Sequence, residues 1–133
     1  MNANASTFGR IAIVGGGRMG ESIMKGLLDA GVASAGDISA VEPDAARREA
    51  LSSAYGVSCS ADAADAVPGA SVVLLAVKPQ VIAAVVSGLS PMIGDALVIS
   101  IAAGVSCALL ESLLGAGTRV VRVMPNTPAM VGS

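Results

Sequence analysis

The sequence predicts an α/β fold, in which a doubly wound parallel sheet of six strands has helices on both faces. Three observations support this prediction. Short apolar runs alternate along the chain with segments of helical spacing, and a glycine cluster joins the first run to the first helix. The strongest apolar run, residues 71–77, shows no polar alternation, which is typical of a buried parallel strand. Right-handed connections then favour the strand order 3-2-1-4-5-6.

The composition limits the classes of function. The chain has 133 residues, enough for one domain, and its net charge is −2 with no clustered basic face, so we expect no nucleic-acid partner. It is 53% hydrophobic with a mean hydropathy of +0.74, which buried strands and an uncovered interface would together explain. No uninterrupted apolar run approaches the roughly 18 residues of a membrane span. The first residues do not resemble a signal peptide, so we expect a cytoplasmic protein.

Few residue types suited to catalysis are present. The chain contains no histidine, the commonest general acid or base and the commonest metal ligand, so we expect no metal site. Cys59 and Cys107 lie far apart in no metal-like spacing, which favours reduced, buried thiols. A bound cofactor or residues outside the chain would therefore have to carry most of any chemistry.

The first strand, residues 10–14, follows a flexible lead-in of residues 1–9 and meets a glycine pattern. Gly15, Gly17 and Gly20 form G-x-G-x-x-G before a helix over residues 19–30. Gly15 would allow the tight turn, Gly17 would let a pyrophosphate touch the backbone, and Gly20 would let the helix pack on the strand. The helix N-terminus would then face the anion, which predicts a dinucleotide site. The alternative is a glycine-rich turn without a ligand.

An acidic residue follows the second strand, residues 38–41. Glu42 lies 22 positions after Gly20, close to the spacing of the acid that binds the adenosine ribose hydroxyls, and this favours NADH over NADPH. The alternative is an acid in the first turn of the helix over residues 44–55, with Asp44 as the N-cap. Arg47 or Arg48 would favour NADPH if either reached a 2′-phosphate, although a solvated helix face is the expected use of both.

The remaining elements continue the alternation of strand and helix. Gly56 ends the second helix, Pro79 suits the first position of a helix, and Ser106 suits an N-cap. We expect strands over residues 57–59, 71–77, 96–101 and 118–124, a helical link over 61–67, and helices over 79–88 and 106–114. In the predicted order the first and fourth strands are neighbours at the topological switch point. The glycine loop and residues 76–80 should therefore line one crevice of a Rossmann-type domain over residues 10–133.

Four motifs resemble those of a known family. GGGRMGESIMKGLLDAG, VVLLAVKPQ, LVISIAAGVS and RVVRVMPNTPAMVG occur in this order and spacing. Together they resemble the N-terminal domain of pyrroline-5-carboxylate reductase, over about residues 10–132. The resemblance implies an oxidoreductase of proline biosynthesis, which uses NADPH or NADH to reduce 1-pyrroline-5-carboxylate, a small cyclic imine, to L-proline.

The resemblance also implies roles for individual positions, but no catalytic residue within the chain. The glycine loop would hold the pyrophosphate, the segments after the fourth and fifth strands would line the nicotinamide side, and the PNTP segment would form the substrate-side wall. The implied cofactor-binding residues are Gly15, Gly16, Gly17, Arg18, Met19, Gly20, Ala76, Val77, Lys78, Pro79, Ile101, Ala102 and Ala103, with Asn126 and Thr127 on the wall. For Lys78 the alternative is a solvated helix start, and for Asn126 it is an ordinary turn residue.

The sequence departs from the family in two ways. Ala63 stands where members often carry an asparagine, so its side chain would not hydrogen-bond on the adenosine side. The family also continues into an all-helical domain that makes a homo-oligomer and supplies much of the substrate pocket. We expect that domain to be absent here and the chain alone to turn over poorly. The alternatives are another imine or β-hydroxyacid reductase domain, or a non-catalytic nucleotide-binding or assembly module.

Overall fold

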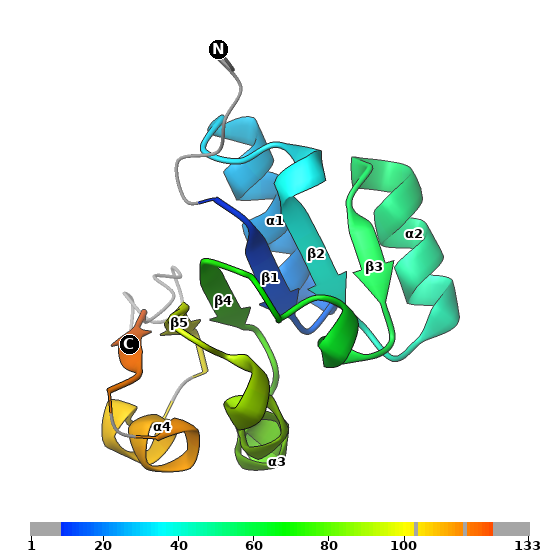
Figure 1. Ribbon diagram of the computed structural model, residues 1–133. Helices are drawn as coiled ribbons and strands as arrows, with labels where there is room; N and C mark the ends of the chain where they lie inside the picture. The colour runs from blue at the N-terminus through cyan, green and yellow to red at the C-terminus, as the bar shows by residue number, and fades with distance from the viewer. Residues whose placement is uncertain (1–8, 103, 116, 124–133) are drawn as a thin grey trace, which may run out of the picture.

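The computed structural model has one six-stranded parallel sheet, and its strand order is β3-β2-β1-β4-β5-β6 (Figure 1). The structure describes residues 9–102, 104–115 and 117–123. The predicted doubly wound sheet and its strand order are confirmed. Of the predicted flexible lead-in, residues 1–8 lie outside the described residues.

Each strand or helix forms close to a predicted position. The strands are β1 (Ile11–Val14), β2 (Ile38–Val41), β3 (Ser58–Ser60), β4 (Val72–Leu75), β5 (Leu97–Ser100) and β6 (Arg119–Arg122). The α-helices are α1 (Arg18–Asp29), α2 (Ala45–Tyr55), α3 (Pro79–Leu89) and α4 (Cys107–Leu114). The short 3₁₀ helices are η1 (Ala35–Asp37), η2 (Ala63–Asp65) and η3 (Ser90–Met92).

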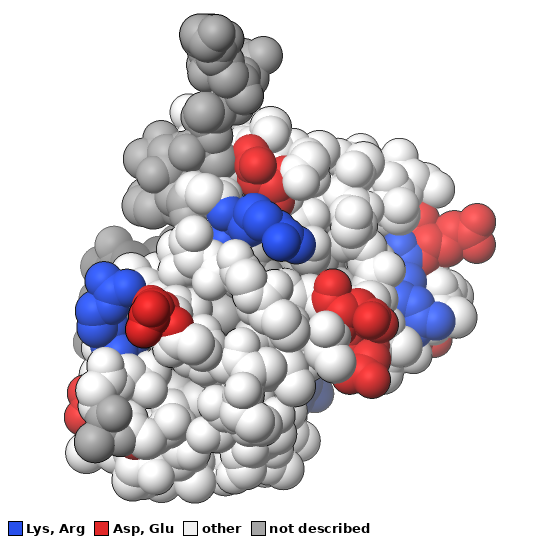
Figure 2. Space-filling view, viewed as in Figure 1, with Lys and Arg blue, Asp and Glu red and all other residues white. Residues whose placement is uncertain are grey.

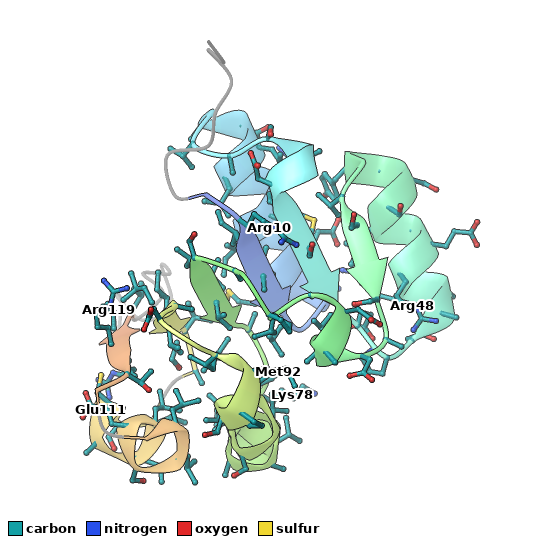
Figure 3. The ribbon with its side chains drawn as sticks, in the orientation of Figure 1. Arg10, Arg48, Lys78, Met92, Glu111 and Arg119 are labelled. Atoms are coloured by element: carbon teal, nitrogen blue, oxygen red, sulfur yellow. The ribbon has the colours of Figure 1, made fainter. Side chains whose placement is uncertain are left out.

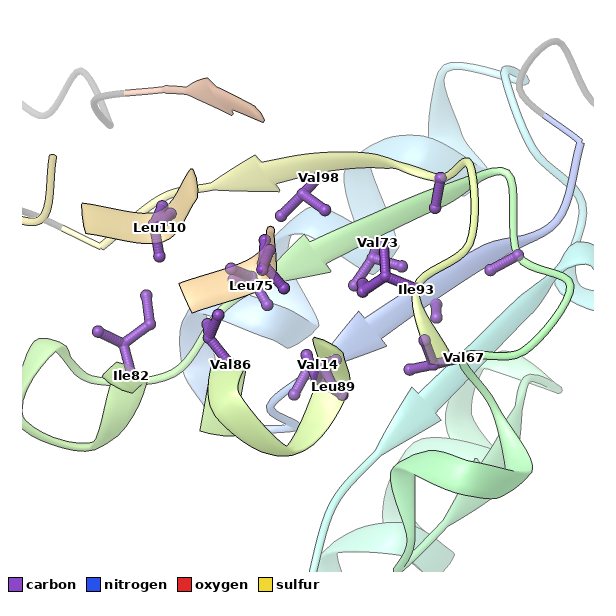
Figure 4. Packing of buried hydrophobic residues seen from close by; sticks show 14 of the residues in the cluster. Val14, Val67, Val73, Leu75, Ile82, Val86, Leu89, Ile93, Val98 and Leu110 are labelled. Atoms are coloured by element: carbon purple, nitrogen blue, oxygen red, sulfur yellow. The ribbon is translucent and has the colours of Figure 1, made fainter. Parts of the chain in front are cut away.

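Two apolar clusters lie on opposite faces of the sheet. In β1, Ile11 and Ile13 belong to the cluster under α1 and α2, whereas Ala12 and Val14 belong to the cluster under α3 and α4. Figure 4 shows the second cluster, in which side chains of α3 and α4 pack against β1, β4 and β5. Because both faces of the central strands are covered, these strands are apolar throughout instead of alternating with polar residues.

The residues at the helix ends explain where three of the helices begin or end. The Asp44 side chain accepts a hydrogen bond from the Arg47 N–H at the start of α2, and Gly56 ends that helix with a φ of +75°. The Ser106 side chain likewise caps α4, and Pro79 is the first residue of α3. By contrast, the N-cap of α1 is Gly17, which has no side chain to bond the first-turn N–H groups. The N-terminus of α1 is therefore left available to a ligand.

Two predicted elements differ from the observed ones. The link over residues 61–67 contains only one turn of 3₁₀ helix, η2. The strand predicted over residues 71–77 ends at Leu75, although the Ala76 N–H still donates to the Val14 carbonyl at 2.8 Å. Ala76 and Val77 turn instead toward the glycine loop, because the chain must pass that loop before it enters α3.

Among the described residues, no helix is long and apolar enough to cross a membrane. The same part of the chain holds no group of three or more cysteine or acidic side chains placed to bind a metal ion. Cys59 and Cys107 are free, as expected, but both are half-buried rather than fully buried.

Candidate functional site

The glycine loop lies directly against the segment that follows β4. Gly15 has a φ of +112°, and a Cβ atom there would come within 2.7 Å of the Ala76 carbonyl oxygen and 3.2 Å of a Val77 methyl carbon. Its position therefore requires glycine both for backbone conformation and for space. The structure brings together the two segments that the strand order predicted to share a crevice.

Gly17 and Gly20 differ in what surrounds them. A Cβ atom on Gly20 would collide with the Gly15 carbonyl oxygen, so this glycine lets the first turn of α1 fold over the loop. Gly17 is exposed, and a Cβ atom there would meet no described residue within 4 Å apart from its two neighbours in the chain. The space beside Gly17 at the helix N-terminus is therefore open to a ligand that must approach the backbone.

Gly16 contacts a side chain of the neighbouring strand instead of the open space. Its N–H donates to Glu42 Oε1 at 3.1 Å, and a Cβ atom would come within 2.9 Å of both the Glu42 Cβ and the same carboxylate oxygen. The other carboxylate oxygen, Glu42 Oε2, accepts the Asp44 N–H at 2.8 Å. Glu42 thus links the glycine loop to Asp44, the N-cap of α2. It lies two residues before that N-cap, so the alternative of an acid in the first turn of α2 is wrong.

Arg47 is part of the loop structure, which corrects the expectation of a solvated helix face. Its Nε donates to the Gly16 carbonyl at 2.6 Å, and its Nη2 contacts Glu21 Oε1 at 2.5 Å. The Tyr55 hydroxyl donates to Glu21 Oε2 at 2.6 Å. The hydrogen bonds from Tyr55 and Arg47 hold the pKa of the Glu21 carboxyl below its ordinary value. These three side chains connect α1, α2 and the glycine loop.

The lowered pKa of Glu21 predicts a pH-dependent stability. Because the folded pKa lies below the unfolded one, the ionised carboxylate stabilises the fold above about pH 4.3 and this contribution is lost as the pH falls through the folded pKa. We expect Glu21→Gln to unfold at a lower temperature than the parent chain at pH 7, with the two melting temperatures converging on acidification. Thermal unfolding of both chains between pH 7 and pH 3 measures this, and a constant gap over that range would contradict it.

Arg48 also differs from the expectation of a solvated helix face. Its Nη1 donates to the carbonyls of Glu42 and Pro43 at 2.9 and 2.8 Å, at the carboxyl end of β2 (Figure 3). A cation and the Glu42 carboxylate therefore lie at the same turn. Cys59 is also near these two charged groups, and burial raises the pKa of its thiol.

An apolar groove of about 730 Å³ extends from the glycine loop along α3. Its lining includes the carboxyl ends of β1 and β2, the turn before η2, and one side of α3, a helix without charged residues. In Figure 2 the surface over α3 is correspondingly almost free of charge. The lining residues include Gly15, Val41, Asp62, Ala63, Val77 and Val81. Val41, Asp62 and Val81 were not singled out from the sequence, because their place in the groove depends on how β2, η2 and α3 come together in the fold.

The other predicted site residues lie at the same edge of the sheet. Lys78 is exposed and forms the N-cap of α3, while Pro79 is exposed at its first position. Ile101 is half-buried and Ala102 buried, directly after β5. Buried Ser100, which sequence analysis missed, accepts the Ala102 N–H through its hydroxyl at 3.3 Å and shapes this turn. Ala103, Asn126 and Thr127 lie outside the described residues.

A separate hollow of about 480 Å³ lies at the opposite edge, at the amino ends of β5 and β6. Its lining is residues 94–96 and 117–119, and Arg119 donates there to the Asp95 carbonyl at 2.7 Å. It is remote from the glycine loop, because the amino and carboxyl ends of parallel strands lie on opposite edges of a sheet.

The residues present at the carboxyl edge fit a dinucleotide. The space beside Gly17 meets an uncapped helix N-terminus, where a pyrophosphate is stabilised by N–H groups and the helix dipole. Glu42 lies beside the loop at the end of β2, and the apolar groove that extends from the loop along α3 has the chemistry to hold a planar base.

Comparison with known proteins identifies the family. A model of the family described as "NADP oxidoreductase coenzyme F420-dependent" matches residues 10–104, more than half of the chain. The chain belongs to this NADP oxidoreductase family. The match spans the glycine loop, Glu42 and the segments after β4 and β5.

Within this family the chain is similar to named reductases. It is 48% identical over 126 residues to the pyrroline-5-carboxylate reductase of Pasteurella multocida, and 43% identical over 123 residues to that of Pseudomonas aeruginosa. These alignments cover 91% and 92% of the chain but 45% of each relative. The chain therefore spans about half the length of the curated relatives it matches. The resemblance inferred from the sequence motifs is confirmed.

Solved structures give the same result. A pyrroline-5-carboxylate reductase from Coxiella burnetii matches with a TM-score of 0.85 and 35% identity, over 93% of this chain and 46% of that one. The pyrroline carboxylate reductase of Plasmodium falciparum, solved with NADP bound, matches with a TM-score of 0.79 and 23% identity, over 96% of this chain and 46% of that one. The second likeness concerns the fold alone.

Proposed function

We propose that residues 10–133 form the NAD(P)H-binding domain of a reductase that converts 1-pyrroline-5-carboxylate to L-proline. The observation that carries this proposal is an open glycine loop at the switch point, in a chain up to 48% identical to pyrroline-5-carboxylate reductases. A cytoplasmic location is part of the proposal and rests on the N-terminal sequence, which does not resemble a signal peptide. Homo-oligomer formation remains an expectation that rests on the resemblance alone.

Each part of the site would have one task in binding and orientation. In the loop from Gly15 to Gly20, the N–H groups of Gly15 and Gly16 are bonded to Val41 and Glu42. The pyrophosphate would therefore be held by the backbone N–H groups from Gly17 onward, with Arg18 and Met19 at the helix start. The groove along α3 would hold the adenosine, and the turns after β4 and β5 would orient the nicotinamide. When bound, the cofactor would supply the hydride that reduces the imine carbon. Asn126 and Thr127 would form the substrate-side wall.

Glu42 supports a preference for NADH within this proposal. Each of its carboxylate oxygens accepts one backbone N–H, and each keeps a lone pair that can accept a ribose hydroxyl. Its negative charge would repel a 2′-phosphate. Arg48 at the same turn would offset part of that repulsion, so we expect the preference to be modest.

Paired titrations with NADH and NADPH test both the site and the preference. We expect NADH to bind the parent chain more tightly, and Glu42→Gln to narrow the ratio of the two dissociation constants by about tenfold or less. This substitution removes the charge and one of the two hydrogen bonds that Glu42 accepts, and the loss of that bond should weaken the binding of both cofactors alike. Nicotinamide fluorescence is a suitable signal because the chain contains no tryptophan.

Glu49→Gln is the matched control, since it removes an exposed carboxylate of α2 and should leave the ratio unchanged. No binding of either cofactor at millimolar protein would refute the proposed function. Binding with a ratio unaffected by Glu42→Gln would refute only the role of Glu42.

A further inference from the structure

We propose that Arg47 is a positioning residue for dinucleotide binding, and that Glu21 and Tyr55 hold it in place. Arg47 would fix the conformation of the glycine loop at Gly16, so that the N-terminus of α1 faces the pyrophosphate before the ligand arrives. This inference rests on the proposed function, because it explains how the proposed phosphate site is held.

The two peptide groups that flank the Gly16 Cα are both held by side chains. On one side, the Gly16 N–H donates to Glu42 Oε1 at 3.1 Å. On the other side, the Gly16 carbonyl accepts from Arg47 Nε at 2.6 Å. Glycine loses more conformational freedom on ordering than any other residue, so an unheld loop would lose that freedom on binding. Because the two hydrogen bonds already order the loop in the folded protein, the loss of conformational entropy occurs on folding and not on binding.

Arg47 is held in turn by two residues that have no other assigned role. Its Nη2 contacts Glu21 Oε1 at 2.5 Å, and the side chains of Arg47 and Glu21 are only 30% and 33% exposed. The Tyr55 hydroxyl, two helical turns further along α2, donates to the second Glu21 oxygen at 2.6 Å. The guanidinium is thereby fixed in direction by a charge-assisted pair.

The direction of the Gly16 carbonyl decides how well an anion can approach. A carbonyl oxygen directed at the pyrophosphate would repel it, whereas this carbonyl is bonded to a side chain of α2. The adjacent Gly17 borders open space and begins α1 without a side-chain cap. Arg47 therefore acts on the phosphate site through the Gly16 peptide, and no direct contact with the ligand is needed.

Two ligands distinguish this role from a general loss of structure. ADP-ribose carries the pyrophosphate, and adenosine lacks it, so only the first depends on the loop. We expect Arg47→Gln to weaken ADP-ribose binding by about tenfold or more while changing adenosine binding by less than about twofold. The affinity of Tyr55→Phe for ADP-ribose should lie between that of the parent chain and that of Arg47→Gln. NMR titration measures all of these affinities.

Amide hydrogen exchange provides a readout that needs no ligand. Loss of the Arg47 contact should speed exchange at Gly16 and Gly17 in Arg47→Gln, with exchange in β1 unchanged. Arg119→Gln is the matched control, because Arg119 also donates to a backbone carbonyl but lies at the opposite edge of the sheet. It should alter neither loop exchange nor the affinity for ADP-ribose.

The outcomes of these experiments separate the positioning role of Arg47 from the proposed cofactor-binding function. Equal ADP-ribose affinity in Arg47→Gln and the parent chain, or equal weakening of ADP-ribose and adenosine, would overturn the positioning role. Unchanged exchange at Gly16 and Gly17 would also overturn it. Failure of the parent chain to bind ADP-ribose, combined with faster loop exchange in Arg47→Gln, would refute the proposed function but support the ordering of the loop by Arg47.

Discussion

Gly20→Ala is expected to destabilise the chain by about 2–4 kcal/mol. The added Cβ would collide with the Gly15 carbonyl oxygen, which is a backbone atom and cannot rotate away as a side chain can. Relief would require α1 to move off β1 and to open the glycine loop. The loss of stability should therefore be accompanied by loss of cofactor binding. Urea unfolding measures the change in the free energy of unfolding.

Gly26→Ala on the same helix is the matched control. Gly26 is exposed, and a Cβ atom there would meet nothing within 4 Å. Alanine favours helix interiors over glycine, so we expect a gain of about 0.5–1 kcal/mol and unchanged cofactor affinity. Similar effects of the two substitutions would show that helix propensity, and not the contact between Gly20 and Gly15, governs the first turn of α1.

Gly17→Val is expected to weaken cofactor binding strongly with little effect on the fold. Gly17 has φ −76° and ψ −164°, a conformation open to any residue, and no atom lies near its Cβ position. Valine is a poorer N-cap than glycine, so we expect a loss of stability of at most about 1 kcal/mol. The side chain would occupy the space where the pyrophosphate must approach the backbone, and affinity should fall by more than about tenfold.

Thermal unfolding and a cofactor titration on the same sample separate these effects. If Gly17→Val bound NADH and NADPH as the parent chain does, the open space beside Gly17 would not be the phosphate site. Gly20→Ala and Gly17→Val therefore test the same loop in two ways, one through its packing and the other through its ligand.

Local sequence signals were sufficient for most of the fold. The apolar runs gave the strands, and Asp44, Gly56, Pro79 and Ser106 marked helix ends through interactions within a few residues. The strand order followed from the arrangement of two βαβαβ halves that is typical of dinucleotide-binding sheets, together with right-handed connections. Strand ends were less predictable, because the turn at Ala76 depends on the distant glycine loop.

The candidate site was only partly predictable for the same physical reason. The spacing of Gly15, Gly17 and Gly20 indicated a phosphate site, since each glycine serves a backbone requirement. Arg47 bonds to Gly16, 31 positions earlier, and nothing in the periodicity of α2 distinguishes it from a solvated arginine. Gly16 was assigned to the pyrophosphate by position, yet its N–H is bonded to Glu42. Contacts of this kind depend on which strands pair and on which side of each helix faces the sheet, and local sequence patterns do not give both.

An amide NMR titration of the 133-residue chain with NADPH tests the central claim most directly. If the carboxyl edge of the sheet binds the dinucleotide, the shifting amides will be those of the loop from Gly15 to Gly20 and of the groove at Val41, Ala63 and Val81. The hollow around Asp95 and Arg119 will remain unchanged. Shifts confined to that hollow, or none at millimolar NADPH, would contradict a dinucleotide site at the switch point.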